Sequence, residues 1–558
     1  MSRSATEKSL PLDDALRAFA DAAAEIAAAK YSVEPPRIAF EAPRRPEFGD
    51  FSTNVAFSLA KTARRSPQEI ATELVAELSL QPGIEGVFSD VQAVAGFINL
   101  RIAPSIWHEV VAQILRDGDR FGAARPNGQR VSLEFGSANP TGPLVVVQGR
   151  SMSIGATLAN AMRFRGYDVF LEWIINDAGR QLDALGHSIY ARYRELFGPY
   201  PFPEDGYPGE YLIPIARRIA QQDGERWRNA PETEWLPYFS KYGRDELVAD
   251  QQRTARRFGV EYDLWQSEAE LHASGKVREG VERLRELGLT YQQDGALFFR
   301  ATQFGDAKDR VLLRSDGRPT YFCMDVAYHY QKLKERDRVV DVLGPDHHGY
   351  IERLQGLASA LGYPGRLEIA IVQQVTLMRG SEQVSMSKRS GEIVPLDEIL
   401  DEVGVDAARF FFIMSAMESP LAFDLKLAAE KETENPVYYV QYGYARIASV
   451  LRRVPAEEIE AARSAALSPL VAPTELALAR RLAEFPSVVA GVVAHLAPHR
   501  LARYARDVAA DFHQFYTECK ILTEDRGQRL ARLALCLAAK TILSRTLTLT
   551  GVSSPDSM

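Results

Sequence analysis

Three side chains, two of them close in the chain and one distant, have the types needed to hold a guanidinium group. Tyr321 and Asp325 are four residues apart in the segment TYFCMDVAYHY, so they share a face if this segment is helical. Glu134 adds a second carboxylate within the apolar run VSLEF. A guanidinium is planar and rich in N–H donors, and carboxylates are its natural bidentate partners. The alternative is a tyrosine of the core and an aspartate of the surface.

Three further segments have the composition of anion-binding or nucleotide-binding loops. NPTGP (139–143) precedes a predicted helix whose free N–H groups favour an anion, unless it is only a tight turn. VSMSKRSG (384–391) carries Lys388 and is typical either of a phosphate-clamping loop or of a mobile basic loop. In LGPDHHGY (343–350), Asp346 is placed to accept ribose hydroxyls; a helix cap followed by surface histidines is the alternative.

Basic residues recur at helical spacing in the last quarter of the chain. Arg500, Arg503 and Arg506 fall near one face of a predicted helix, with Tyr504 adjacent, and Arg446 belongs to a second basic cluster. Basic stripes with aromatic residues suit contacts to an RNA backbone and to exposed bases. A solvated helix face is the alternative for each stripe.

Composition limits the class of protein. The chain has 558 residues and a formal net charge of −8, which excludes a globally basic nucleic-acid binder but not local basic patches. Its three cysteines are sparse and odd in number, which argues against a disulfide framework or a zinc site and favours a reducing compartment. No signal peptide or membrane-spanning run is apparent, so we expect a cytoplasmic protein without a metal site.

The elements that must position these residues form an α/β protein of three parts. Residues 1–120 mix helical and strand patterns and predict a small α+β domain. Residues 131–175 read as strand, turn, helix and strand, which predicts a parallel, doubly wound sheet in a domain spanning 121–424. Residues 186–300 are long, charged and irregular and are expected to be an insertion. From 425 to 558 strand patterns vanish, which predicts an all-α domain.

The order of the motifs resembles that of the class I arginyl-tRNA synthetases. The succession is SANPTGP, INDAGRQ, YPGEYL, TYFCMDVAYH, GPDHHGY, MSKRSG, VGVDAARFFF and NPVYYVQYGYARI. The resemblance covers nearly the whole chain. It implies a Rossmann-like catalytic domain with an insertion, an N-terminal tRNA-contacting domain and a C-terminal anticodon-binding domain. It also implies that arginine and ATP form arginyl-adenylate, usually with tRNA bound, and that the arginyl group then passes to tRNA(Arg).

The resemblance assigns roles to individual positions. Those expected to hold arginine are Glu134, Asn139, Tyr321 and Asp325. Those expected to bind ATP are Gly149, Gly344, Asp346, His347, Ser387 and Lys388, with magnesium accompanying the ATP. Lys388 matches the second lysine of the family's KMSKS signature and is expected to be catalytic, as is Gln148. Contacts to tRNA are expected from Arg446, Arg500 and Arg503.

One signature of the family is degenerate here. After NPTGPL the family has the HIGH signature, His-x-Gly-His, where this chain has Val145, Val146, Val147 and Gln148, and Ser385 stands at the first lysine position of KMSKS. Losing one preorganised donor to a charge that develops in the transition state typically costs ~10²–10³ in rate. A valine in place of the glycine adds a branched side chain where adenine would pack on bare backbone. We therefore expect arginine activation to fall by roughly 10⁴-fold or more if the donor effects add.

Three hypotheses follow from the altered signature. The first is an arginine–tRNA ligase with an impaired ATP site, in which Gln148 partly replaces one histidine. The second is a non-catalytic paralogue that binds tRNA(Arg) or arginine. The third is a transferase that uses arginine or arginyl-tRNA without forming the adenylate. By resemblance we expect a monomer.

Overall fold

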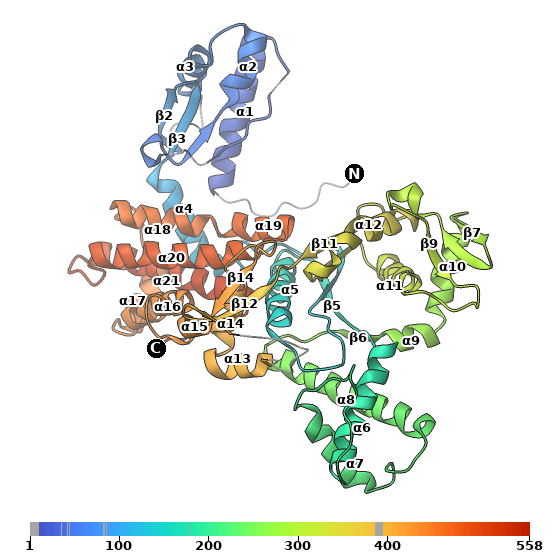
Figure 1. Ribbon diagram of the computed structural model, residues 1–558. Coiled ribbons are helices and arrows are strands. Elements are labelled where there is room, and N and C mark those ends of the chain that lie inside the picture. The colour runs from blue at the N-terminus through green and yellow to red at the C-terminus, as the bar shows by residue number, and fades with distance from the viewer. Residues whose placement is uncertain are drawn as a thin grey trace.

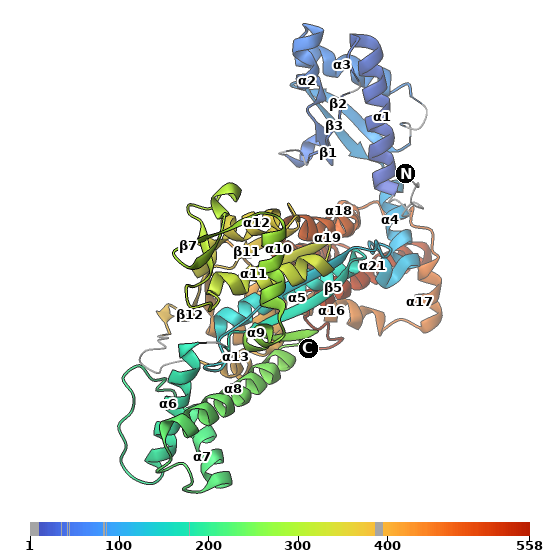
Figure 2. The ribbon, with the colours of Figure 1, turned by 90° about the vertical axis from the view of Figure 1, so that its right-hand side faces the viewer.

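The computed structural model describes residues 11–34, 36–41, 43, 45–81, 84, 86–177, 179–384 and 394–558. Figure 1 shows a small N-terminal domain that projects from a larger body, and Figure 2 shows the same projection from the side. In the body, the C-terminal helices lie on one side of a central parallel sheet and two further groups of elements extend from the other side.

The N-terminal domain is a three-stranded antiparallel sheet with three helices. Its strand order is β1-β3-β2, and β2 and β3 form a hairpin over the run that the sequence marks as strand-like. A capping box at Ser66 and Glu69 fixes where α3 begins. The bounds are α1 Pro11–Tyr31, η1 Pro46–Phe48, β1 Phe51–Thr53, α2 Val55–Ala63, α3 Pro67–Leu78, β2 Phe88–Val94 and β3 Phe97–Ile102.

The catalytic domain is built on a five-stranded parallel sheet. Its order is β11-β10-β4-β5-β6, so the chain leaves β4 toward β5 and later returns to the other side of β4 as β10. The boundary between β4 and β10 is therefore the switch point, where open parallel sheets bind ligands at the carboxyl ends of their strands. The bounds are β4 Arg130–Phe135, α5 Val146–Phe164, β5 Asp168–Ile175, β6 Leu264–Ser267, α11 Tyr321–Glu335, β10 Arg338–Leu343, η4 Pro345–Tyr350, α12 Ile351–Ala360 and β11 Leu367–Ile371.

The expected insertion over about 186–300 differs from the structure in two respects. It is regular rather than irregular, with long helices whose aromatic residues build a core of their own. It is also interrupted by β6, which pairs with β5 as the edge of the main sheet. A four-residue strand within charged sequence gives too short an alternation to be recognised. The bounds are α6 Arg180–Glu195, α7 Leu212–Asp223, α8 Glu232–Arg257, α9 Glu268–Ala273, α10 Lys276–Glu286, β7 Thr290–Gln293, β8 Ala296–Phe299, η3 Ala301–Phe304 and β9 Arg310–Leu313.

A second small sheet joins the catalytic domain to the helical domain. Strand β12 pairs in parallel with β14 and antiparallel with β13. Helix α14 packs against both α5 and α16, and α13 packs against α5. The bounds are β12 Val375–Arg379, β13 Glu382–Gln383, α13 Leu396–Val403, α14 Val405–Phe412, β14 Leu421–Asp424 and α15 Leu425–Ala429.

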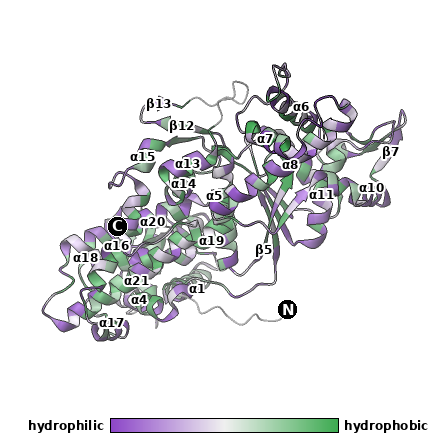
Figure 3. Cartoon of the chain, turned by 90° about the horizontal axis from the view of Figure 1, so that it is seen from below, coloured by the Kyte–Doolittle hydropathy of each residue, from purple (hydrophilic) through white to green (hydrophobic). Residues whose placement is uncertain are grey.

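The all-α C-terminal domain is a helical bundle that also receives α4 from the N-terminal part of the chain. Helices α18 and α19 are separated at Glu484, because Pro486 in the first turn of α19 has no N–H to continue the hydrogen bonds of α18. In Figure 3 hydrophobic and hydrophilic residues alternate along most helices, as amphipathic helices that bury one face require. The bounds are α4 Pro104–Asp117, α16 Pro436–Leu451, α17 Ala456–Arg463, α18 Pro473–Ala483, α19 Phe485–His495, α20 His499–Glu518 and α21 Arg526–Thr550.

Helix α21 is long and apolar enough to cross a membrane by length and composition alone. However, 72% of its most apolar stretch is buried among the other helices of the bundle. Core helices of globular proteins pass the same test, so its burial accounts for its composition.

Helix α5 is buried along nearly its whole length and positions the start of the functional site. Gly155 lets it lie directly on β4, because a Cβ atom there would be 2.1 Å from the ring of Phe135. The fully buried guanidinium of Arg150 donates to the carbonyl oxygens of Gln373, Ala416 and Ser419, each at 2.9 Å. These contacts fix α5 against the main sheet and against the segments around β12 and β14.

We predict that Gly155→Ala lowers stability by about 1–3 kcal/mol through overpacking against Phe135, although alanine favours helices. The midpoint of urea unfolding measures the change. Gly527→Ala in α21 is the matched control, because the added Cβ would have only the Asp525 carboxylate as a neighbour, at 3.4 Å. It should leave stability unchanged or raise it by up to about 1 kcal/mol. Equal midpoints for the two variants would contradict the close packing of α5 on β4.

Candidate active site

A cavity of about 660 Å³ opens at the carboxyl ends of β4, β5 and β10, at the switch point of the main sheet. It brings together side chains that are up to two hundred residues apart in the sequence. The residues expected there that line it are Glu134, Asn139, Gln148, Tyr321, Asp325, Gly344, Asp346 and His347. One cavity therefore collects the carboxylates, the turn and the GPDHHGY segment.

The turn 139–143 is held by the segment that interrupts the catalytic domain. The side-chain amide of Gln251 on α8 donates to the carbonyl oxygens of Asn139 at 3.0 Å and of Gly142 at 2.9 Å. The Tyr211 hydroxyl, just before α7, donates to the carbonyl oxygen of Thr141 at 2.7 Å. With these carbonyl groups engaged, the turn keeps a fixed shape and the Asn139 side chain lines the cavity.

The four residues at the HIGH position divide between the core and the cavity. Val146 is fully buried in the hydrophobic core, and Val145 is half-buried and forms a β-bridge with Pro395. Val147 and Gln148 line the cavity. The Gln148 side-chain oxygen accepts a hydrogen bond from the Val145 N–H at 3.3 Å, so Gln148 closes the first turn of α5. Of the three valines at this signature, Val147 is therefore the one that faces the cavity.

Glu134 and Asp325 form what we call the acidic wall of the cavity. A third carboxylate that the sequence did not indicate, Glu268, lies close to it. Burial raises the pKa of Asp325 to about 6. Burial, together with Asp177 and Asp325, raises the pKa of Glu268 to about 7. Glu268, Tyr321 and Asp325 line an adjoining cavity of about 760 Å³. A cation bound between these groups would relieve the cost of burying their charge.

Glu134 is held at both of its carboxylate oxygens. One accepts from the Ser137 hydroxyl at 3.1 Å, and the other accepts from the ammonium of Lys332 at 2.8 Å. Lys332 also donates to Asp341 on β10 at 2.6 Å, and Asp341 contacts His329 Nε2 at 2.9 Å. The carboxylate of Glu134 is therefore positioned before any ligand arrives.

The GPDHHGY segment forms η4 at the mouth of the cavity. Gly344 precedes the helical turn and its carbonyl oxygen accepts from the His347 N–H at 3.1 Å. Asp346 and His347 are exposed at this rim. The rim lies directly after β10, where the sequence pattern places it.

Two of the expected ATP-binding residues, Ser387 and Lys388, fall within residues 385–393, outside the described residues. The chain that follows this stretch is well defined. The Leu396 N–H donates to the carbonyl oxygen of Leu144 at 2.7 Å, beside the start of α5. Gly149 does not line the cavity: a Cβ there would be 2.8 Å from Leu396 and 2.9 Å from Phe412, so this glycine serves helix packing.

In the helical domain, Arg446 stands in an aromatic cluster. Its guanidinium lies over the rings of Tyr442 and Tyr516, 4.5 and 4.9 Å from their centroids. Burial and the neighbouring Arg446 lower the pKa of His513 to about 4, so this imidazole is neutral at physiological pH. The cluster combines one cation with ring faces, a combination that suits stacking of exposed bases.

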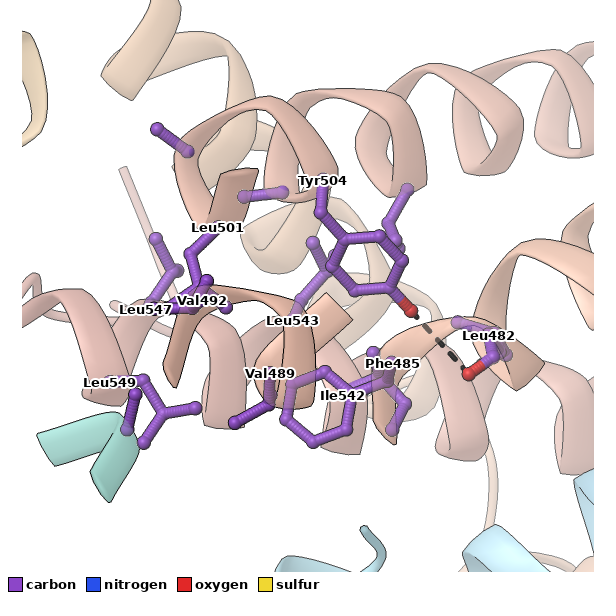
Figure 4. Close-up of a cluster of buried hydrophobic side chains, with 14 of the residues drawn as sticks. Leu482, Phe485, Val489, Val492, Leu501, Tyr504, Ile542, Leu543, Leu547 and Leu549 are labelled. Carbon is purple, nitrogen blue, oxygen red and sulfur yellow. Dashed lines mark hydrogen bonds between the residues drawn. The ribbon is translucent and has the colours of Figure 1, made fainter. Parts of the chain in front are cut away.

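Arg500, Arg503 and Arg506 are exposed along α20, as their spacing predicts. Tyr504 is not beside them on the surface. It is 3% exposed, and its hydroxyl donates to the carbonyl oxygens of Arg481 and Leu482 (Figure 4). The interpretation of Tyr504 as part of a basic, aromatic stripe is therefore wrong: at helical spacing it points into the core while the arginines point out.

Three family models match the chain. They are the arginyl tRNA synthetase N terminal domain at 13–102, the class I (R) tRNA synthetase catalytic domain at 239–415 and the DALR anticodon binding domain at 440–558. Arginine–tRNA ligase of Syntrophotalea carbinolica is 44% identical over 530 residues, covering 94% of this chain and 95% of that relative. Its counterpart in Heliobacterium modesticaldum is 42% identical over 536 residues, covering 94% of each chain.

The chain belongs to the class I arginyl-tRNA synthetase family. The fold agrees with solved members: the Thermus thermophilus arginyl-tRNA synthetase has a TM-score of 0.76 at 23% identity, covering 97% of this chain and 100% of that one. The Plasmodium falciparum enzyme has a TM-score of 0.75 at 15% identity, covering 99% and 100%. The resemblance inferred from the motifs and the three-part α/β architecture are confirmed. ATP is a substrate of this class, and arginine and tRNA(Arg) are the partners that the family implies.

Sequence reasoning missed several residues of this arginyl-tRNA synthetase site. Glu268 follows β6, so recognising that short strand would have placed it at the carboxyl edge of the sheet. Lys332 and His329 share a helix with Asp325 at spacings of seven and four, which is a usable signal. Gln251 carries no local signal, because its partners are backbone carbonyl groups more than a hundred residues away.

We predict that Gln251→Leu destabilises the protein by about 1–3 kcal/mol for each carbonyl group left without a donor. Thermal unfolding measures the loss. Gln252→Leu is the matched control, since successive side chains of a helix point about 100° apart. If the two variants melt alike, Gln251 does not hold the turn.

Proposed function

We propose that this protein attaches arginine to tRNA(Arg) through arginyl-adenylate, and that it forms the adenylate slowly. One observation carries the proposal: Val147 lies in the cavity wall at the position where the family signature has glycine, while Glu134, Tyr321 and Asp325 line the same cavity. Arginine recognition is retained in this view, and nucleotide binding is the impaired step.

The acidic wall supports binding of arginine. Glu134 and Asp325 come from different elements, β4 and α11, and face one cavity together with Tyr321. No cationic side chain forms an ion pair with Asp325 among the described contacts, so a guanidinium would supply its missing partner. Asn139 at the other end of the wall has its side-chain oxygen engaged by Asn176 at 3.0 Å, which leaves its amide N–H groups for the substrate.

The nucleotide half of the cavity supports slow activation. Gly344, Asp346 and His347 stand at the rim as the family pattern expects, and the first turn of α5 presents the Gln148 side chain. Gln148 can donate a hydrogen bond to a phosphate through its amide, but it carries no charge. Lys388 is expected to supply the cation that phosphates require.

A second function is favoured by the same valine. If Val147 excludes adenine altogether, the chain is a non-catalytic paralogue that binds tRNA(Arg) or arginine. The exposed arginines of α20 and the Arg446 cluster would serve either function, because tRNA binding does not require ATP.

We expect ATP to enter as its magnesium complex and the protein to act as a monomer in the cytoplasm. Arg446, Arg500 and Arg503 are proposed to contact tRNA(Arg). Replacing one of these arginines by a neutral residue should weaken tRNA binding more at low salt than at high salt, because its contact to a phosphate is electrostatic.

Arginine-dependent exchange between ATP and pyrophosphate, with and without tRNA(Arg), tests the proposal beside a tRNA-binding assay. Exchange that is slow but stimulated by tRNA supports a ligase with an impaired ATP site. Tight tRNA binding without any exchange supports the non-catalytic paralogue. Arginine that fails to bind under any condition would contradict both functions.

Restoring the signature is predicted to restore activation. The triple variant Val145→His, Val147→Gly, Gln148→His should raise exchange by roughly 10⁴-fold if the donor effects add. Val147→Gly alone should give more than Val145→His alone, because only residue 147 of the two lines the cavity. Val471→His, on the exposed surface, is the control that should change nothing. A triple variant no faster than the parent would place the defect elsewhere.

Arginine affinity is predicted to depend on pH. The pKa of Asp325 is raised by burial to about 6, and a guanidinium binds the ionised carboxylate, so protons compete with arginine below that pH. The dissociation constant should rise by about tenfold for each pH unit below 6 and level off above 7. Calorimetric titration between pH 5 and 8 measures it. Asp325→Asn should bind more weakly and lose the dependence; an unaltered profile in that variant would refute the assignment.

A further inference from the structure

Lys332 is a buried lysine that stands behind the acidic wall of the cavity. Its side chain is 4% exposed, and it is absent from the described residues that line the cavity. Its ammonium lies 2.8 Å from Glu134 and 2.6 Å from Asp341, and 4.1 Å from the centroid of the Tyr328 ring. It therefore joins β4 and β10 across the switch point through two residues that do face the cavity.

The groups around Lys332 carry an excess of negative charge. Glu134 comes from β4, Glu172 from β5 and Asp341 from β10, and all three are at most 5% exposed. Glu172 is engaged by the hydroxyls of Ser132 at 2.8 Å and Tyr328 at 3.1 Å rather than by a cation. Around this core the remaining charged groups are His329 and Asp325 on α11, His347 on η4 and Arg353 on α12.

Lys332 and the imidazole of His329 are the basic groups that directly contact these buried carboxylates among the described ion pairs. Burial lowers the pKa of Lys332, but Asp341 and Glu134 outweigh it and hold that pKa above its usual value. Lys332 and His329 likewise outweigh burial and hold the pKa of Asp341 below its usual range. The lysine is thus charged at any pH at which the protein works.

We propose that Lys332 is a positioning residue for the amino-acid substrate: its ammonium fixes Glu134 and Asp341 in place and balances their buried negative charge, so that arginine binds without exchanging protons with them. This inference rests on the proposed binding of arginine in the same cavity. Lys332 acts through Glu134 and does not touch the substrate.

The physical reason is the cost of burying like charges. Without Lys332, Glu134 and Asp341 would lie side by side on neighbouring strands with no cation shared between them. Two buried carboxylates placed in this way retain a proton. Arginine would then have to expel that proton to obtain an ionised Glu134. With Lys332 present, the free-energy cost of burying the two carboxylates is offset when the protein folds, and substrate binding does not have to offset it.

Calorimetric titration of arginine in two buffers that differ in ionisation enthalpy counts the protons released. At pH 8, above the pKa values of Asp325 and Glu268, the parent protein should release fewer than about 0.3 protons, and Lys332→Met should release close to one. The variant's affinity should also rise about tenfold per pH unit between 7 and 9, whereas that of the parent should stay level. A role confined to stability would change neither quantity.

Lys334→Met is the matched control, because Lys334 lies on the same helix and pairs with Glu279 at the exposed surface. It should behave as the parent. Lys332→Arg keeps the charge and should keep proton release low even if its geometry weakens binding. The His329–Asp341 contact is common to all four proteins, so the difference between them reports Lys332.

The parent measurement keeps the inference testable if Lys332→Met does not fold. Release of about one proton by the parent at pH 8 would overturn it. Equal release by the parent and by folded Lys332→Met would also overturn it. Parent protein that does not bind arginine at all would instead refute the proposed function, which separates the two failures.

Discussion

The position of helix α5 is the constraint on which the site depends. Helix α5 lies so close to β4 that a Cβ atom at Gly155 would clash with the Phe135 ring. Near the start of α5, Arg150 donates hydrogen bonds to carbonyl groups on two other segments. Because β4 ends at the switch point, a helix fixed in this way must begin there. The turn 139–143, the residues at the HIGH position and Glu134 all take their places from that packing.

The segment that interrupts the catalytic domain also contributes contacts to the site. Gln251 and Tyr211 occupy the carbonyl groups of the turn, and Gln251 is fully buried with its own side-chain oxygen left without a partner. A buried polar atom without a partner is costly, and it is tolerated here where the amide donates two hydrogen bonds. On the next turn of the same helix, Thr254 contacts Asp397 at the start of α13. Helix α8 therefore links the turn to the helix that follows residues 385–393.

Sequence patterns predicted the features that depend on neighbouring residues. The periodicity of α5, the apolar strands β4, β5 and β10 and the four-residue spacing of Tyr321 and Asp325 were enough to place the cavity and most of its expected residues. The short strand β6 was not predicted, since four residues give too little alternation, and Glu268 was missed with it. Tyr504 was misassigned because proximity to arginines in sequence does not decide which face of a helix a side chain occupies.

What sequence patterns could not predict are contacts between distant segments. The pairing of Lys332 with Glu134 joins residues 198 positions apart, and neither residue signals the other. Their charges alone are compatible with exposure, which is the usual state of both types. The parallel pairing of β10 with β4 brings Lys332 on α11 next to Glu134 on β4. This pairing buries two residue types that are usually exposed.

The altered signature shows which requirements have changed. Leu144 and Val146 are buried in the core, and Gly149 packs against Phe412, so these positions carry the fold and suit it. The family's histidines and glycine belong to positions 145, 147 and 148, which are partly exposed. A valine and a glutamine fit the fold there, because Val147 packs at the edge of the core and Gln148 accepts from the Val145 N–H. Val147 and Gln148 therefore bear on what the cavity can hold, and the proposed impairment of nucleotide binding rests on these two positions.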